Sequence, residues 1–375
     1  MEPDDVTIAP AVGPPVELHP FAATRLSPGR VGDPASARLL ARPHRAVPER
    51  IQRWRRLGNL VQDERPALYV HEYSSQGLAV RAVVGLASVH RAAATLAGPG
   101  IVPHEDVDRH QAEELAARMH AMRVNPAPIL LAHRAGVPTR DLVDAATLSR
   151  PLTDYVDRAG QRHRFWAVTE ESAIAELAAS FRDARLLVAD GHHRLAAYQL
   201  LDAEESEPGW DRGLVMAVDQ SDTPLFLGAI HRVLHGVDAS DLVGAVRRLG
   251  IGELRDLGDA SPVVGLDQRT LVITTGERSW AVTVPESSPF APVEVLHREL
   301  LPHVPEHRVE FHHTAEAALA RLTSPARGVE ERTVVLVPAL TYDAVDAVVA
   351  AGRRLPEKAT SFQPKSSIGA IMRSF

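Results

Sequence analysis

The residues best suited to chemistry are five consecutive ones, Asp190-Gly191-His192-His193-Arg194, which follow the apolar run Leu186–Ala189. Because apolar periodicity resumes at Leu195, this stretch predicts a strand, a tight turn and a helix. The first amides of a helix have no acceptor within the helix, and the helix dipole adds positive charge at that end. Glycine lets the backbone approach a ligand, and arginine matches phosphate oxygens with two N–H groups. The stretch therefore predicts a site for a nucleotide phosphate.

The charges around this turn leave two interpretations open. Asp190 would repel a bare phosphate, so we expect a magnesium ion or a ribose hydroxyl between the two groups. His192 and His193 could donate to phosphate or carry protons, and Asp190 and His193 are candidate catalytic groups. In the simpler interpretation, Asp-Gly is an ordinary turn and Asp190 caps the helix. The fully apolar strand before the turn favours the binding site.

A second candidate is the pair His104-Glu105, at the expected start of a helix over residues 105–123. A carboxylate at that position is favoured by the helix dipole, which would explain Glu105 without any function. The functional interpretation makes Glu105 a general base that takes the proton of a substrate hydroxyl, with His104 beside it. The pair by itself does not decide between the two.

Further cationic groups could contact the same anion. His231-Arg232 follows the expected strand 225–230, where a phosphate contact and a surface ion pair are both compatible with the sequence. Lys358 and Lys365 stand out in a lysine-poor chain, in a segment whose Pro and Gly residues argue against a helix. The alternative is a frayed C-terminus. We expect residues 356–375 to fold back over the phosphate site.

The histidines also raise the question of a metal centre. His192, His193 and His231 could be taken for a zinc cage, but adjacent side chains on a helix diverge and rarely share an ion. His307, His312 and His313 form a second group. Magnesium held by Asp190 is the favoured metal, because hard oxygen ligands suit that ion.

The elements that must position these residues alternate along the chain without strict regularity, which favours a mixed α/β or α+β fold. We expect a mobile Pro-rich tail over residues 1–16 and an irregular stretch from His19 to Pro48. Residues 17–235 would carry the nucleotide-binding core, and residues 236–375 a C-terminal α/β part. Helices are expected at 48–57, 105–123, 171–182, 195–201, 238–249, 293–301, 314–322 and 342–351. Strands are expected at 67–71, 79–84, 129–132, 186–189, 213–218, 225–230, 271–275, 280–284, 308–311 and 333–337.

Composition excludes several classes of protein. The 375 residues are 45% hydrophobic and 24% charged, as in a folded globular protein. Cysteine is absent, which removes disulfides, thiolate catalysis and cysteine zinc sites. The net charge of −7 gives no overall attraction for nucleic acid or an anionic membrane. Because no apolar run spans a membrane and the start is acidic, we expect a cytoplasmic protein.

Several motifs together resemble a known family. The stretch from Asp190 to Gln199 is similar to the nucleotide-binding turn of the ParB and sulfiredoxin fold. The whole set resembles domain-of-unknown-function family 1015, relatives of the free-serine kinases. The other matching stretches are His19-Pro20-Phe21, Gly100–Glu105, Asn125-Pro126, Trp166, His231-Arg232 and Pro356–Lys365. Arg42-Pro43-His44-Arg45 departs from the Pro-Pro-Tyr-Asp element of that family, and Ala359 and Gln363 depart from its C-terminal motif.

The resemblance implies a ParB/sulfiredoxin-like core and an ATP- or ADP-dependent kinase that uses magnesium and phosphorylates a small hydroxyl compound. Serine or a related amino acid is the first candidate substrate. His192 stands where sulfiredoxins have cysteine, so reduction of a sulfinic acid is not expected. Two alternatives remain: a ParB-like nucleotide-binding regulatory or scaffold protein, and a phosphatase or transferase that acts on a phosphorylated amino acid. Because a basic patch and a helix-turn-helix are both lacking, a DNA-binding switch is disfavoured.

Overall fold

The computed structural model describes residues 6–7, 10–13, 15–41, 47–75, 77–89, 95–134, 136–204, 209–323 and 331–375. These fall into two compact units. The first contains residues up to Leu225 together with Asp346–Arg354 and Pro364–Phe375, and the second contains Phe226–Val345 and Leu355–Gln363. The division lies before the expected boundary at residue 235, and the chain returns to the first unit at its end. The stretch Arg42–Arg45 lies outside the described residues.

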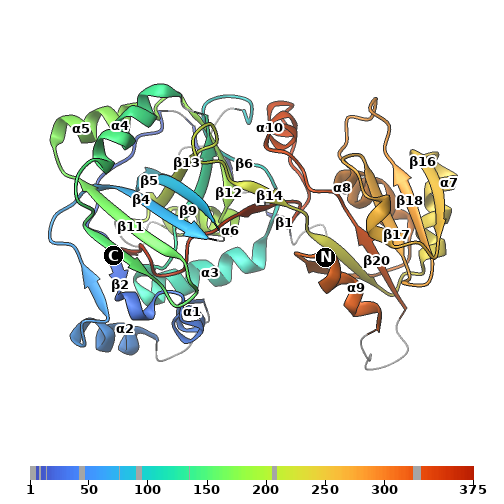
Figure 1. The fold of residues 1–375 in the computed structure, drawn as a ribbon, viewed down its shortest axis with the longest axis horizontal. Helices are drawn as coiled ribbons and strands as arrows, with labels where there is room; N and C mark the ends of the chain where they lie inside the picture. Colours follow the sequence, from blue (N-terminus) through green and yellow to red (C-terminus); the bar gives the residue numbers. More distant parts are fainter. Residues whose placement is uncertain are drawn as a thin grey trace. The chain divides into compact units, whose positions relative to one another are not determined.

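The first unit is built on an eight-stranded mixed sheet, seen in Figure 1. Its order is β10 (Thr153–Val156), β11 (Arg162–Val168), β4 (Leu68–Ser75), β5 (Leu78–Ser88), β13 (Arg212–Asp219), β9 (Ile129–His133), β12 (Arg185–Asp190) and β6 (Gly100–Pro103). The pairs β13–β9 and β12–β6 are parallel, and the others are antiparallel. The helices are α1 (Pro34–Ala41), α2 (Val47–Arg56), α3 (Arg109–Met122), α4 (Val137–Thr147), α5 (Glu171–Ala179) and α6 (His192–Ala203).

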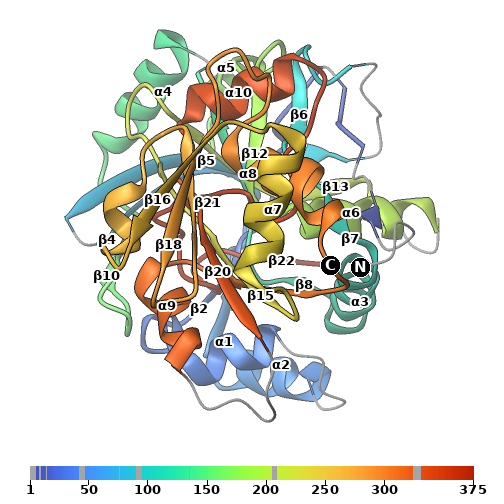
Figure 2. The same ribbon diagram turned by 90° about the vertical axis from the view of Figure 1, so that its right-hand side faces the viewer.

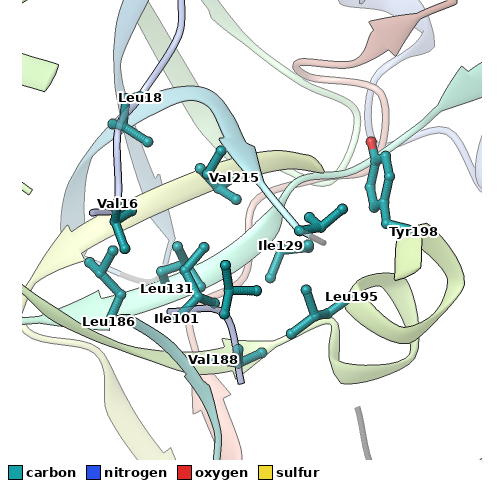
Figure 3. Close-up of a cluster of buried hydrophobic side chains, with 14 of the residues drawn as sticks. Val16, Leu18, Ile101, Ile129, Leu131, Leu186, Val188, Leu195, Tyr198 and Val215 are labelled. Carbon is teal, nitrogen blue, oxygen red and sulfur yellow. The ribbon is translucent and has the colours of Figure 1, made fainter. Parts of the chain in front are cut away.

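Alternation along these strands gives the sheet two different faces. Ile129 and Leu131 of β9 belong to a buried apolar cluster with Val188 of β12 and Leu195 of α6 (Figure 3). The residue between them, Leu130, instead lines a pocket. One face of the sheet therefore packs into the hydrophobic core under helices α3 to α6, and Leu130 on the other face borders the pocket described below.

The second unit contains a six-stranded antiparallel sheet, best seen in Figure 2. Its order is β16 (Glu253–Gly258), β18 (Ser279–Thr283), β17 (Thr270–Thr274), β20 (Arg332–Leu336), β15 (His231–His235) and β19 (Arg308–His312). The helical segments are α7 (Ala239–Leu249), α8 (Pro292–Glu294) with the π-helical turn Val295–Leu300, α9 (Ala315–Thr323) and α10 (Tyr342–Ala350), whose last residues belong to the first unit. A short pair joins β14 (Phe226–Gly228) to β21 (Ser361–Gln363).

The mixed α/β architecture is confirmed, and several local expectations need correction. The tail is shorter than residues 1–16, because Val12 and Val16 are buried and β1 (Val6–Thr7) pairs with β7 (Val107–Asp108). The stretch from His19 to Pro48 is not wholly irregular, since it contains β2 (Thr24–Leu26), paired with β3 (Leu60–Gln62), and α1. None of the described helices is long and apolar enough to cross a membrane.

Candidate active site

The Asp190–Arg194 stretch folds as a strand, a turn and a helix, as its sequence predicts. The apolar side chains of β12 are buried, and Asp190 is the last residue of the strand. Gly191 has a φ of 95° and is the N-cap of α6, which begins at His192. Leu195 and Tyr198 fix the orientation of α6 because both side chains are fully buried in the core (Figure 3).

Gly191 leaves the space that the Arg194 side chain occupies. A Cβ atom at residue 191 would lie 2.6 Å from Nε and 2.7 Å from Nη2 of Arg194, closer than such atoms approach. The guanidinium therefore folds back over the turn and forms an ion pair with Asp190. Its Nε is buried and has no hydrogen-bond partner within the described part of the chain. A donor left in this state at a helix N-terminus is suited to an incoming anion.

The C-terminal segment brings a second cation to the same carboxylate. Lys365 Nζ forms an ion pair with Asp190 Oδ1, while Arg194 uses Oδ2. Gln161 fixes the backbone there, because its Nε2 donates to the Lys365 carbonyl at 3.0 Å and its Oε1 accepts from Ser367 N at 2.8 Å. Tyr73 adds a hydrogen bond of 2.8 Å from its hydroxyl to the Pro364 carbonyl.

The balance of charge at this point is positive. Burial by itself would raise the pKa of Asp190, but the neighbouring Arg194 and Lys365 outweigh it and hold the pKa below the ordinary value. One ionised carboxylate therefore faces two cations, and the group carries a surplus positive charge. Such an arrangement can bind a phosphate without first having to be protonated.

A pocket of about 410 Å³ opens beside these charges. Asp190, Arg194, Lys365 and Ser367 supply its polar wall. Its other lining residues are small or apolar: Gly32, Ala37, Ala127, Pro128, Leu130, Met216 and Ile368, with Ser366 beside them. A cavity with apolar walls and a few convergent charged groups is the usual form of a site for a small ligand.

His104 and Glu105 do not lie at a helix start, which corrects that expectation. Helix α3 begins at Arg109, where the Asp108 carboxylate caps the Gln111 amide at 2.8 Å. The dipole of α3 therefore does not explain Glu105. Glu105 instead lies beside the first residue of α6, with its Oε1 3.4 Å from His192 Nδ1.

His104 is fully buried beside the same helix. Its Nδ1 lies 2.7 Å from the Val188 carbonyl, and its ring meets the His192 ring edge to face at 4.6 Å. Burial lowers the pKa of His104 to about 4 and lowers the pKa of His192 well below 6.5, so both rings are neutral at pH 7. His193 is half-buried at the second position of α6.

The remaining predicted residues belong to the second unit. His231 begins β15 rather than following a strand, and Arg232 is fully buried. The guanidinium donates to the Ile230 carbonyl, to His297 Nε2 at 3.1 Å and to the Lys358 carbonyl at 3.1 Å. A phosphate contact by Arg232 is therefore not supported, because the side chain is enclosed by protein acceptors. Lys358 donates to Glu357 at 2.6 Å and lies over the Phe311 ring.

A buried polar network behind the C-terminal segment was missed from the sequence. Ser367 Oγ donates to Asp157 Oδ2 at 2.6 Å, His163 Nε2 lies 3.2 Å from the same oxygen, and His71 Nε2 lies 3.0 Å from His163 Nδ1. The sequence did contain one signal for it, because His71 and Tyr73 are two positions apart on a strand and so share one face. Together with the Gln161 hydrogen bonds, this network holds the backbone around Ser367 and so positions Lys365.

The family described as "Protein of unknown function (DUF1015)" matches residues 15–320. The chain belongs to this family. The matched residues of this DUF1015 protein include the Asp190–Arg194 turn and the His104-Glu105 pair, and they end before Lys365. No curated protein matches the sequence.

Solved structures similar to this DUF1015 protein are distant in sequence. A conserved hypothetical protein from Pyrococcus furiosus is 18% identical, with a TM-score of 0.41, over 72% of this chain and 90% of the other. A free serine kinase in complex with AMP is also 18% identical, with a TM-score of 0.41, over 72% and 88%. SbnI with a C-terminal truncation, from Staphylococcus aureus, is 12% identical, with a TM-score of 0.43, over 76% and 85%. These likenesses are too distant to transfer an activity.

Proposed function

We propose that the protein is a nucleotide-dependent kinase that phosphorylates the hydroxyl of a small metabolite, with serine or a related amino acid as the first candidate. The observation that carries the proposal is that Arg194, which folds over Gly191, and Lys365 both line the 410 Å³ pocket. The resemblance of the sequence motifs to the free-serine kinases supports this reaction, and the geometry around Asp190 supports an anion site.

The cations support the transfer step. Phosphoryl transfer depends mainly on positioning and on neutralising charge that spreads over the phosphate oxygens. Arg194 and Lys365 converge from two distant segments and carry more positive charge than Asp190 offsets. The phosphates of a bound ATP or ADP would pair with Arg194 and Lys365 in place of Asp190.

Magnesium is expected to arrive with the nucleotide. In this structure both oxygens of Asp190 are engaged by Arg194 and Lys365, so the carboxylate is not arranged to hold a metal by itself. Once a phosphate draws the two cations away, the Asp190 oxygens become suitable hard ligands for magnesium. The residue thus supports a nucleotide-linked magnesium ion.

The proton of the acceptor hydroxyl requires a base, and we assign it to Glu105. Its side chain is 13% exposed and lies 3.4 Å from His192, the residue that follows Gly191. The His104 ring also packs against the His192 ring. His193, next along α6, is the alternative proton acceptor. The hydroxyl oxygen would attack the terminal phosphorus, the bond to the leaving nucleotide would break, and Glu105 would take the proton.

The test is a ligand screen on the full chain with ATP, ADP and CTP plus magnesium, followed by detection of phosphorylated products across the free amino acids. A phosphorylated hydroxyl amino acid, formed with loss of one phosphate from the nucleotide, is the expected result. Tight nucleotide binding without any product would favour the regulatory alternative. Release of phosphate from a phosphorylated amino acid would favour the hydrolytic one.

A further inference from the structure

Three side chains that commonly bind metals converge at the start of α6. His104 and Glu105 come from the segment after β6, and His192 is the first residue of the helix. One possible ligand atom from each lies within 4.8 Å of the others. His104 and His192 are buried and Glu105 is nearly so. Two imidazoles and a carboxylate are a recurrent donor set for divalent transition metals.

His104 is prepared to act as a ligand through one particular nitrogen. A backbone carbonyl can only accept, so the hydrogen bond of 2.7 Å to Val188 requires the proton on Nδ1. The neutral ring then has its lone pair on Nε2. Metal-bound histidines usually donate their other N–H to a carbonyl or carboxylate in this way, which fixes both the tautomer and the ring orientation.

His192 provides the second observation. Its Nε2 is buried and finds no hydrogen-bond partner among the residues described. Its Nδ1 lies 3.4 Å from Glu105 Oε1, which is long for a hydrogen bond. A buried polar nitrogen without a partner is unfavourable, and a bound ligand, water or ion would satisfy it.

We propose that His104, Glu105 and His192 bind a divalent transition-metal ion of the zinc class. Imidazole nitrogen favours Zn²⁺ or Co²⁺ over Mg²⁺, which prefers oxygen. The carboxylate offsets one of the two metal charges, and three protein ligands leave a position for water or a substrate oxygen.

This site goes beyond the proposed kinase and does not depend on it. It differs from the magnesium expected at Asp190 in its ligands. A carboxylate that holds a metal is a weaker base, so Glu105 would act as a base only in the metal-free protein.

The experiment uses the full chain without a tag, stripped with a chelator and titrated with Co²⁺ in the absence of nucleotide. Visible absorption bands that saturate at one ion per chain, and disappear when Zn²⁺ is added, are expected. His192→Ala and His104→Ala should each weaken the binding by at least about 100-fold, because loss of a residue that only supports a ligand already costs roughly 10–100-fold. His110→Ala is the matched control, because His110 is 79% exposed on α3 and should leave the titration unchanged.

Loss of folding is checked by the thermal transition of each variant. If either alanine variant fails to fold, Glu105→Gln is titrated in its place. The melting temperature of the wild-type chain is then also measured with and without Zn²⁺, and a rise with Zn²⁺ is expected. Absence of saturable binding in the wild-type chain overturns the proposal, as does undiminished binding in a folded ligand variant. ATP titration of the same stripped sample reports on the nucleotide site separately, so a failure of either proposal is recognised independently.

Discussion

Lys365 and Asp190, 175 positions apart in the sequence, form an ion pair beside the turn that opens α6. The Lys365 side chain is 41% exposed, so the pair alone contributes little to stability. What holds the segment is its backbone, through Gln161 and Tyr73. The amine is therefore placed by the fold and remains able to move to a ligand.

Replacing this amine should affect turnover more than nucleotide binding. Lys365→Met removes the charge and keeps most of the side-chain volume, and we expect kcat to fall roughly 10²-fold because charge in the transition state loses a partner. Lys365→Arg should retain part of the rate. Steady-state kinetics and calorimetric nucleotide titration of the three proteins measure both effects. Equal kcat in Lys365→Met would remove the residue from the transfer step.

Arg194→Ala should weaken nucleotide binding by about tenfold or more, since charge-assisted hydrogen bonds contribute roughly 1.5–3 kcal/mol. Arg109→Ala is the matched control, because Arg109 also pairs with a carboxylate four positions away but lies 63% exposed on α3. Calorimetric titration with ATP and ADP gives the affinities. Identical affinity in the two variants would mean that Arg194 does not contact phosphate.

Gly191→Ala should reduce nucleotide affinity in addition to stability. The left-handed backbone costs a non-glycine residue roughly 1–2 kcal/mol, and the new Cβ would also displace the Arg194 guanidinium. Gly58→Ala separates the two effects, because Gly58 has a φ of 68° and open space where its Cβ would lie. Chemical denaturation should show destabilisation of both variants, while titration should show weaker nucleotide binding for Gly191→Ala alone.

Glu105→Gln tests the proposed base in protein stripped of transition metals and supplied with nucleotide and Mg²⁺. The amide keeps the shape of the side chain but cannot accept the proton, so turnover should fall by about 10²–10⁴-fold. Nucleotide affinity should be unchanged, because the phosphate contacts come from other residues. Single-turnover measurements report on the chemical step. Unchanged turnover in the folded variant would direct the search for the base to His193 or Asp190.

Acid should destabilise the first unit through its buried histidines. Burial lowers the pKa of His71 and of His163 below 6.5, so the unfolded chain binds more protons than the folded one as the pH falls through that value. Stability therefore decreases from about pH 6.5 downward. His71→Phe, beside the stacked ring of Phe165, should flatten this dependence. Melting temperatures of the wild type and of His71→Phe, measured from pH 8 to pH 5, give the pH dependence of stability. Parallel curves for the two proteins would contradict the explanation.

Local sequence signals predicted much of the architecture around the site. The apolar run before Asp190 predicted β12, and the resumed periodicity at Leu195 predicted α6. Two elements were missed or misplaced although their capping signals were present. Asp33 accepts from the Ala35 amide before Pro34 opens α1, and Asp108 caps α3. In both places a short polar residue marked the true helix start.

Local chemistry could be predicted from the order of residues: a strand, a glycine turn with an arginine four residues after Asp190, and a His-Glu pair. Which of these groups lie next to one another could be seen only in the folded protein. Lys365 forms an ion pair with Asp190. His104 and Glu105 lie close to His192, whereas Arg232 is buried in the second unit. The physical reason is that strand and helix formation depends on neighbours along the chain. Convergence of distant side chains depends instead on sheet order and burial, which local periodicity does not encode.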